Sequence, residues 1–128
     1  MSVLLDTSVV IDLLRAFPAA LRYSRTLDDA PVCSEITRVE VLRGVRSAER
    51  ASTRRFFQTL GWVALDEPIA RRAGEMGRAW RRSHPGISTA DLVIAASAEE
   101  LGVDLVTLNV RHFPMFKGLR PPYRASSN

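Results

Sequence analysis

Three carboxylates, those of Asp6, Glu40 and Asp91, occupy positions from which they could act together on a metal ion. Each lies where a run of core-type residues gives way to a helix. In a parallel α/β fold such positions open onto one crevice beyond the carboxyl ends of the strands. Carboxylate oxygens are the ligands that Mg²⁺ prefers in proteins. The spacing of these acids therefore points to metal chemistry at one edge of a sheet.

Each of these acids also has an ordinary structural explanation. Asp6 could cap a helix or favour its first turn, an effect worth roughly 1 kcal/mol. Asp91 forms a capping-box pattern with Ser88, but the apolar run 92–96 after it predicts a buried helix that would hold this acid rigidly. Helical periodicity does not single out Glu40 from other acids. The acids that fit no worse are Asp12, Glu35 and Glu75.

Short buried strands alternate with pairs of helices along the chain. Strands are expected at residues 3–5, 32–33, 61–65 and 103–108. The order βααβααβααβ predicts an α/β fold, with a parallel sheet covered on both faces and right-handed crossovers. The 128 residues suffice for one domain, expected at 1–120 and followed by a flexible C-terminal tail, 121–128.

The composition favours a polyanionic partner and a cytoplasmic location. The net charge is +4 and Lys117 is the only lysine, so nearly all basic groups are guanidinium forks that suit phosphate. A genome rich in arginine codons would give the same composition. There is no basic leader and no apolar stretch of the roughly 20 residues that a membrane helix needs. The single cysteine, Cys33, excludes an internal disulfide and suits a buried strand.

Four motifs together resemble the PIN-domain ribonucleases, and most closely the VapC toxins of type II toxin–antitoxin pairs. The motifs are Leu4-Leu5-Asp6-Thr7-Ser8, Glu40-Val41-Leu42-Arg43-Gly44, Thr89-Ala90-Asp91-Leu92-Val93-Ile94-Ala95-Ala96 and Leu105-Val106-Thr107-Leu108-Asn109-Val110-Arg111-His112-Phe113. The resemblance implies a three-layer α/β/α PIN-like fold with a short central parallel sheet of four to five strands. It also implies RNA as substrate, Mg²⁺ or Mn²⁺ as cofactor, a VapB-like antitoxin as partner, and a homodimer that assembles with the antitoxin.

The resemblance also assigns roles to residues of this chain. The acids matching Asp6, Glu40 and Asp91 are catalytic and bind the metal in that family. We expect Asp6 and Asp91 to be direct ligands, with Glu40 and Asn109 acting through metal-bound water. Many members have a fourth acid where this chain has Asn109, and an amide adds no charge to hold a second ion. The hydroxyls expected to support the ligands are those of Thr7, Ser8 and Thr107.

Substrate contacts and two alternative functions stay open at this point. The arginines expected nearest the crevice are Arg15, Arg43 and Arg111. In one alternative, His84 and His112 act as acid and base in a metal-free cleavage of RNA. In the other, the chain is a non-catalytic RNA-binding or protein-interaction module that has kept the PIN-like fold.

Overall fold

The computed structural model describes residues 2–125 and has the predicted βααβααβααβ order. Its helices and strands are β1 (Val3–Leu5), α1 (Thr7–Leu14), α2 (Pro18–Ser24), β2 (Val32–Ser34), α3 (Glu35–Leu42), α4 (Arg50–Phe57), β3 (Gly61–Val63), α5 (Glu67–Trp80), α6 (Thr89–Leu101) and β4 (Asp104–Val106). Two 3₁₀ turns, η1 (Ser47–Glu49) and η2 (Val110–His112), complete the described elements.

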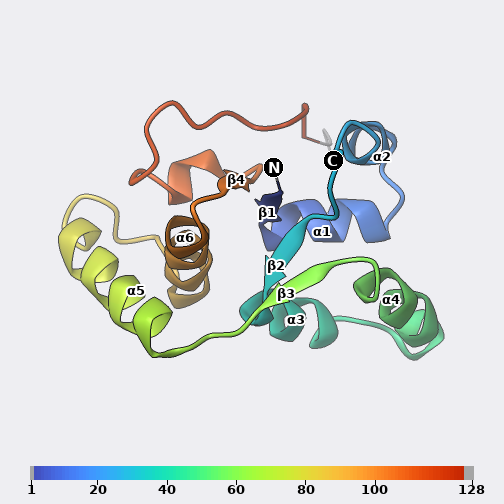
Figure 1. Ribbon diagram of the computed structural model, residues 1–128, viewed down its shortest axis with the longest axis horizontal. Helices are drawn as coiled ribbons and strands as arrows, with labels where there is room; N and C mark the ends of the chain where they lie inside the picture. The colour runs from blue at the N-terminus through green and yellow to red at the C-terminus, as the bar shows by residue number, and fades with distance from the viewer. Residues whose placement is uncertain (1, 126–128) are drawn as a thin grey trace.

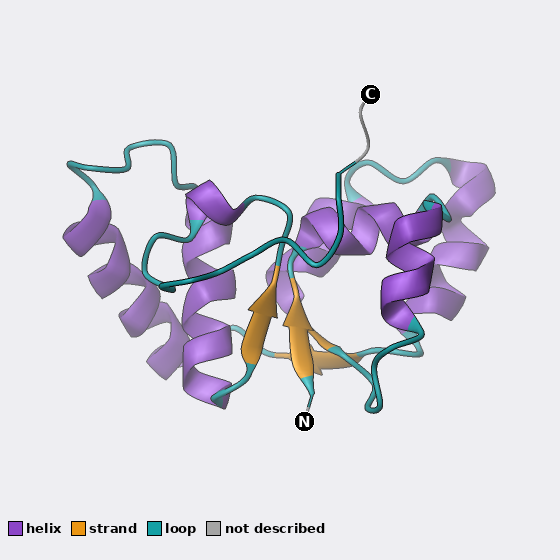
Figure 2. Ribbon diagram, turned by 90° about the horizontal axis from the view of Figure 1, so that it is seen from above, coloured by secondary structure: helices purple, strands orange, loops and turns teal. Residues whose placement is uncertain are grey.

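The four strands form one parallel sheet in the order β3-β2-β1-β4. The first and last strands of the chain are neighbours, since Val3 pairs with Asp104 and Leu5 with Val106. Their carboxyl ends therefore lie together, and β2 ends beside them. Figure 2 shows the sheet between two groups of helices. The predicted α/β class and a sheet of four to five strands are confirmed.

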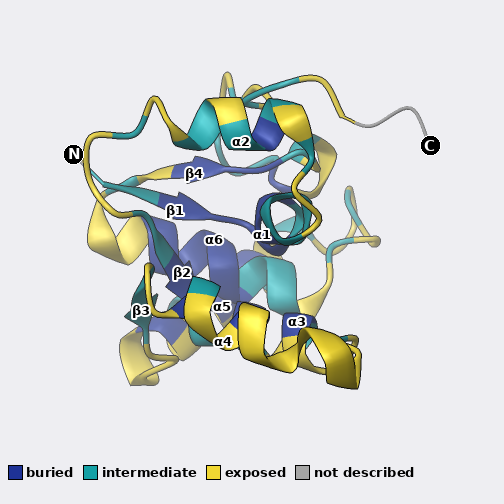
Figure 3. Ribbon diagram, turned by 90° about the vertical axis from the view of Figure 1, so that its right-hand side faces the viewer, coloured by how far each residue is buried: buried dark blue, intermediate teal, exposed yellow. Residues whose placement is uncertain are grey.

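Two hydrophobic cores lie on opposite faces of this sheet, because successive strand residues point to opposite sides. Leu4 and Leu105 pack in the core formed with α5 and α6. Leu5 and Val106 pack in the other core, with residues of α1, α3 and α4. Figure 1 shows α5 and α6 on one side of the strands and α1, α2 and α4 on the other, which is the predicted three-layer arrangement. In Figure 3 most of β1 and β4 is buried, β3 is of intermediate burial, and the outer helices carry much of the exposed surface.

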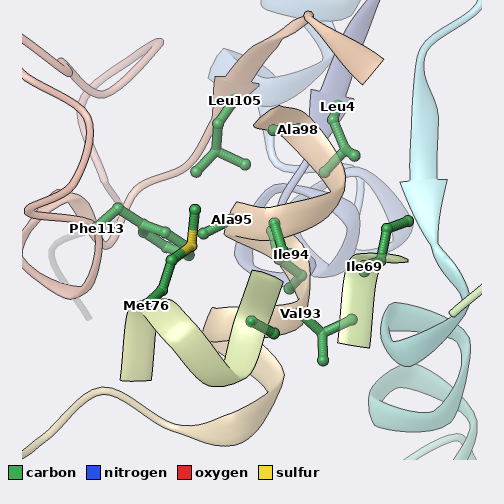
Figure 4. Packing of buried hydrophobic residues seen from close by; sticks show 11 residues of the cluster. Leu4, Ile69, Met76, Val93, Ile94, Ala95, Ala98, Leu105 and Phe113 are labelled. Carbon is green, nitrogen blue, oxygen red and sulfur yellow. The ribbon is translucent and has the colours of Figure 1, made fainter. Parts of the chain in front are cut away.

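The core under α5 and α6 is built from apolar side chains of both helices, of β1 and β4, and of Phe113. Met76 of α5 packs with Ala95 of α6 and with Phe113, which is fully buried although it follows the last strand (Figure 4). The two helices approach closely at Gly77, where a Cβ atom would come within 3.0 Å of Leu92 Cδ1. This packing fixes α6 against the sheet, and with it the first turn of α6.

Cys33 lies in the second core, as its sequence setting indicates. The side chain is fully buried, and burial raises the pKa of its thiol to about 12. The thiol is therefore neutral near pH 7 and is a packing group rather than a nucleophile.

The third and fourth strands end earlier than the sequence predicts. They stop at Val63 and Val106 instead of reaching residues 65 and 108. Side-chain hydrogen bonds to nearby backbone compete with regular structure. After β3, Asp66 Oδ1 accepts from the amide of Ile69, and after β4, Thr107 Oγ1 accepts from the amide of Asn109.

Tyr123 lies beyond the predicted domain boundary at residue 120 and is attached to the domain. Its hydroxyl donates to Asp12 Oδ2 of α1 over 2.9 Å, and its ring contacts those of Phe17 and Tyr23. Residues 126–128 of the predicted tail lie outside the described residues. The boundary itself stays a prediction.

Candidate active site

Asp6 lies at the junction of β1 and α1, at the carboxyl edge of the sheet. Its backbone N–H donates to the carbonyl of Val106, which ties the junction to β4. The side chain is only 3% exposed, and its Oδ2 accepts hydrogen bonds from Thr107 Oγ1 over 2.6 Å and Ser8 Oγ over 2.9 Å. Asp6 occupies the N-cap position but makes no capping bond with its side chain. The ordinary explanation as a helix cap therefore does not account for this buried acid.

The environment of Asp6 opposes its negative charge. Burial is the main effect that raises the pKa of the Asp6 carboxyl above its ordinary value, and the hydroxyls of Thr107 and Ser8 only partly offset it. The negative charge of Asp91 raises the pKa of Asp6 further. The two carboxylates are thus close enough to repel each other, and a cation shared by both would relieve the repulsion.

Glu40 reaches the same edge through a chain of hydroxyls. Thr7, the residue after Asp6, donates from Oγ1 to Glu40 Oε1 over 2.6 Å. Because this uses its only proton, Thr7 accepts from Thr37 Oγ1, which lies 2.9 Å away. Thr37 is fully buried one turn before Glu40 on α3, a spacing that places both on one helix face. Sequence reasoning missed Thr37, although this spacing was a usable signal.

Asp91 lies in the first turn of α6 and forms the capping box that its sequence pattern indicates. Its Oδ2 accepts from the backbone N–H of Ser88 over 3.0 Å, and its own N–H donates to Ser88 Oγ. The same Oδ2 lies 3.1 Å from Nδ1 of His112, and the Asp91 side chain is only 14% exposed. The structural explanation and the ligand role of Asp91 are therefore compatible.

Asn109 and Arg111 follow β4 at this edge, whereas Arg15 and Arg43 lie at the C-terminal ends of α1 and α3. Asn109 follows β4 and is exposed, and it lines a hollow of about 420 Å³ together with Arg111 and His112. Arg15 lines a second hollow of about 420 Å³ between the ends of α1 and α3. Arg43 is exposed at the end of α3. Within residues 2–125 none of the three arginines forms an ion pair, so their guanidinium groups are available to phosphate.

The other acids that fit the helical periodicity as well as Glu40 have partners away from this edge. Asp12 accepts from Tyr123, Glu35 forms an ion pair with Arg38, and Glu75 forms one with Arg72. Among the acids that periodicity did not separate, Glu40 is the one that contacts Thr7, the residue next to Asp6.

The two histidines are likewise separated by their contacts. His84 packs edge-on against Trp80 and contacts Ser83, whereas His112 contacts Asp91. No contact joins the two rings in the described part of the chain, so an acid–base pair of histidines has no geometric support.

The donor set of this edge suits a hard divalent cation. It consists of carboxylate, hydroxyl and amide oxygens, which Mg²⁺ and Mn²⁺ prefer to nitrogen or sulfur. Residues 2–125 contain no group of three or more His, Cys, Asp or Glu side chains already arranged to hold a metal ion. Mg²⁺ usually takes only one or two direct carboxylates and keeps several of its waters, so the oxygens of this edge would suit it without such a group.

The fold and this acidic edge together define a nuclease-like α/β domain, and comparison with known proteins identifies the family. Residues 3–116 match the PIN domain family. The chain is 44% identical over 123 residues to ribonuclease VapC19 of Mycobacterium tuberculosis, covering 94% of this chain and 98% of that protein. It is 41% identical to ribonuclease VapC10 of the same species, covering 94% and 92%. The chain belongs to the PIN-domain family and, within it, to the VapC ribonucleases.

A solved structure supports the same assignment. A toxin–antitoxin complex from Klebsiella pneumoniae matches 97% of this chain and 100% of its own chain, with a TM-score of 0.84 and 25% sequence identity. None of the helices in residues 2–125 is long and apolar enough to cross a bilayer.

Proposed function

We propose that this protein is an endoribonuclease toxin that hydrolyses RNA phosphodiester bonds in the cytoplasm with Mg²⁺ or Mn²⁺. The observation that carries the proposal is the buried Asp6 carboxylate, held by two hydroxyls beside the charge of Asp91 at the carboxyl edge of the sheet. Two neighbouring acids placed in this way add no stability to the fold, but they can serve as ligands of a cation.

In this proposal each residue of the edge has a separate task. Asp6 and Asp91 hold the ion directly, while Glu40 and Asn109 orient its waters. When bound, the ion would supply an activated water and a polarised phosphate, so that no basic side chain is needed. Thr107 and Ser8 fix the Asp6 carboxylate, and Thr7 fixes Glu40.

The basic surface supplies attraction for the substrate. The net charge of +4 draws a polyanion toward the protein, although the site itself is acidic. Arg111 beside Asn109, and Arg15 and Arg43 at the ends of α1 and α3, would contact phosphates on either side of the cleaved bond. The acids would then act on the metal and the arginines on the flanking backbone.

The proposal is tested by incubating the purified protein with total RNA, with Mg²⁺ or Mn²⁺ and with EDTA, and mapping the fragment ends. Endonucleolytic cleavage that requires the metal and is lost in Asp91→Asn supports it. A non-catalytic module would instead bind RNA in EDTA and never cut it. Cleavage that survives EDTA would contradict the metal mechanism.

A small antitoxin is the proposed partner, as the Klebsiella complex suggests. The antitoxin could bind in the hollow between the ends of α1 and α3. This hollow is lined by Ile11, Leu14 and Val41 together with Arg15. Val41 adjoins Glu40, so a segment bound there would lie beside the active site. Expression of the toxin alone should stop growth, and co-expression with the product of a neighbouring gene should restore it. Harmless expression of active, folded protein would contradict this part of the proposal.

A second copy of the chain is the other proposed partner. Val39 and Leu42, one turn apart on α3, are 58% and 47% exposed and place two large apolar side chains on one face of this helix. We propose that these residues contribute to a homodimer interface. Light scattering should give twice the monomer mass for the wild type and the monomer mass for Val39→Asp. A monomeric wild type would contradict the dimer but not the nuclease.

A further inference from the structure

His112 contacts Asp91 at the acidic edge, although it has no task in the proposed metal mechanism. Its Nδ1 lies 3.1 Å from Asp91 Oδ2, the oxygen that also accepts from the Ser88 amide. Within the described residues both contacts to this carboxylate end on Oδ2, which leaves Oδ1 for a cation or its waters. An imidazole protonated on Nδ1 can donate to Oδ2 in its neutral and in its charged form.

The backbone that carries His112 is fixed relative to Asp91. The amide of His112 donates to the carbonyl of Asn109 over 2.9 Å within η2. The next residue, Phe113, is fully buried and packs with Met76 and Ala95 in the core under α6 (Figure 4). Because α6 also carries Asp91 in its first turn, both members of the contact are attached to the same rigid core. The ring is 47% exposed, so burial does not explain its position.

The geometry points to His112 as a positioning residue that holds the Asp91 carboxylate in the orientation needed to bind the metal. This inference rests on the proposed function, in which Asp91 is a direct ligand. Groups that contact a ligating carboxylate from outside the metal shell orient it, and their loss typically weakens metal binding about 10–100-fold. His112 does not touch the substrate in this assignment.

Two conservative substitutions separate the ring nitrogens. In His112→Asn the side-chain amide nitrogen occupies roughly the position of Nδ1, whereas in His112→Gln it occupies roughly that of Nε2. Mn²⁺ binding is measured by titration calorimetry on the RNA-free protein. We expect about tenfold weaker binding in His112→Ala and His112→Gln, and binding close to that of the wild type in His112→Asn. Cleavage by His112→Ala should recover at saturating Mn²⁺, because the defect is in affinity.

The controls distinguish this inference from the proposed function. Thermal unfolding in EDTA verifies that each variant is folded, and Asp91→Asn gives the loss expected for a direct ligand. Wild-type affinity in His112→Ala, or equal loss in His112→Asn and His112→Ala, would overturn the inference while leaving the nuclease proposal intact. A wild type that binds no Mn²⁺ would overturn both.

Discussion

The carboxyl edge of β1 and β4 and the core under α5 and α6 are both buried, but they are built in opposite ways. The core is lined by apolar side chains such as Ile94 and Met76. The edge buries Asp6, Thr7 and Thr107 instead, and it includes an acid whose pKa is raised by that burial. Every fully buried side-chain polar atom in residues 2–125 nevertheless has a partner. The core therefore stabilises the fold, whereas the buried charge at the edge lowers the free energy of unfolding.

Asp6→Asn has the largest expected effect and tests the difference between the edge and the core. Asp6→Asn should reduce metal-dependent cleavage about a thousandfold or more, since losing a direct ligand removes several kcal/mol of transition-state stabilisation. The free energy of unfolding in EDTA at pH 7 should be unchanged or higher, because a buried charge is removed. Gel assays of RNA cleavage and chemical denaturation measure the two effects. Asp12→Asn serves as the control that should cleave normally, because the Asp12 carboxylate accepts from Tyr123.

The pH dependence of this stability difference has a defined sign. The pKa of Asp6 is raised in the folded state above its ordinary value of 3.8. The folded protein therefore retains this proton to higher pH, and the contribution of Asp6 to stability falls as the pH rises from near 4 through the folded pKa. The advantage of Asp6→Asn in EDTA should appear over that rise and persist at neutral pH. A variant less stable than the wild type at pH 7 would show that the Asp6 charge stabilises the fold.

Ile94→Ala tests the other region and should reverse the pattern. Removing this fully buried side chain from the core of α6 should lower the free energy of unfolding by about 2–5 kcal/mol. Cleavage per folded molecule, measured well below the melting temperature, should stay near that of the wild type. A large loss of cleavage in folded protein would mean that the core controls the position of Asp91 more directly than the comparison implies.

Thr107→Val sharpens the comparison, because it removes one hydroxyl from the edge and keeps the shape of the side chain. Asp6 Oδ2 loses its 2.6 Å donor, and cleavage should fall about 10–100-fold. Stability should fall by about 1 kcal/mol. Ser97→Ala is the matched control, since Ser97 is a buried hydroxyl that donates to the carbonyl of Val93 away from the edge. Equal loss of cleavage in both variants would remove the special role of Thr107.

Tyr123→Phe gives the smallest expected effect and concerns the segment beyond residue 120. It removes the hydrogen bond to Asp12 and keeps the ring contacts, so the free energy of unfolding should fall by about 0.5–1.5 kcal/mol. Cleavage should not change. Unchanged stability would indicate that this segment is not part of the domain's cooperative structure.

The sequence was sufficient for the architecture because its signals were local. Runs such as Val3-Leu4-Leu5 and the pattern of apolar residues in α5 predict elements directly, and their alternation predicts a parallel sheet. Strand ends were overestimated at Leu65 and Leu108. There the hydrophobic pattern continues, while side-chain hydrogen bonds and exposure end the strand.

The site was only partly predictable, because its contacts join residues far apart in the chain. Asp6 and Asp91 could be selected by position at strand and helix ends, but periodicity could not separate Glu40 from Glu35 or Asp12. Only the resemblance selected Glu40, and the contact through Thr7 joins residues 33 positions apart. The contact between His112 and Asp91 depends on how η2 lies against α6, which no local pattern specifies.

The central claim is that folding gathers Asp6, Glu40 and Asp91 around one divalent cation. Anomalous diffraction from crystals soaked in Mn²⁺ tests it most directly, because it locates the ion without depending on activity. The account predicts a single strong peak at the carboxyl edge, bound directly by Asp6 and Asp91, with Glu40 and Asn109 reached through water. No peak at that edge, or a peak bound by other residues, would contradict it.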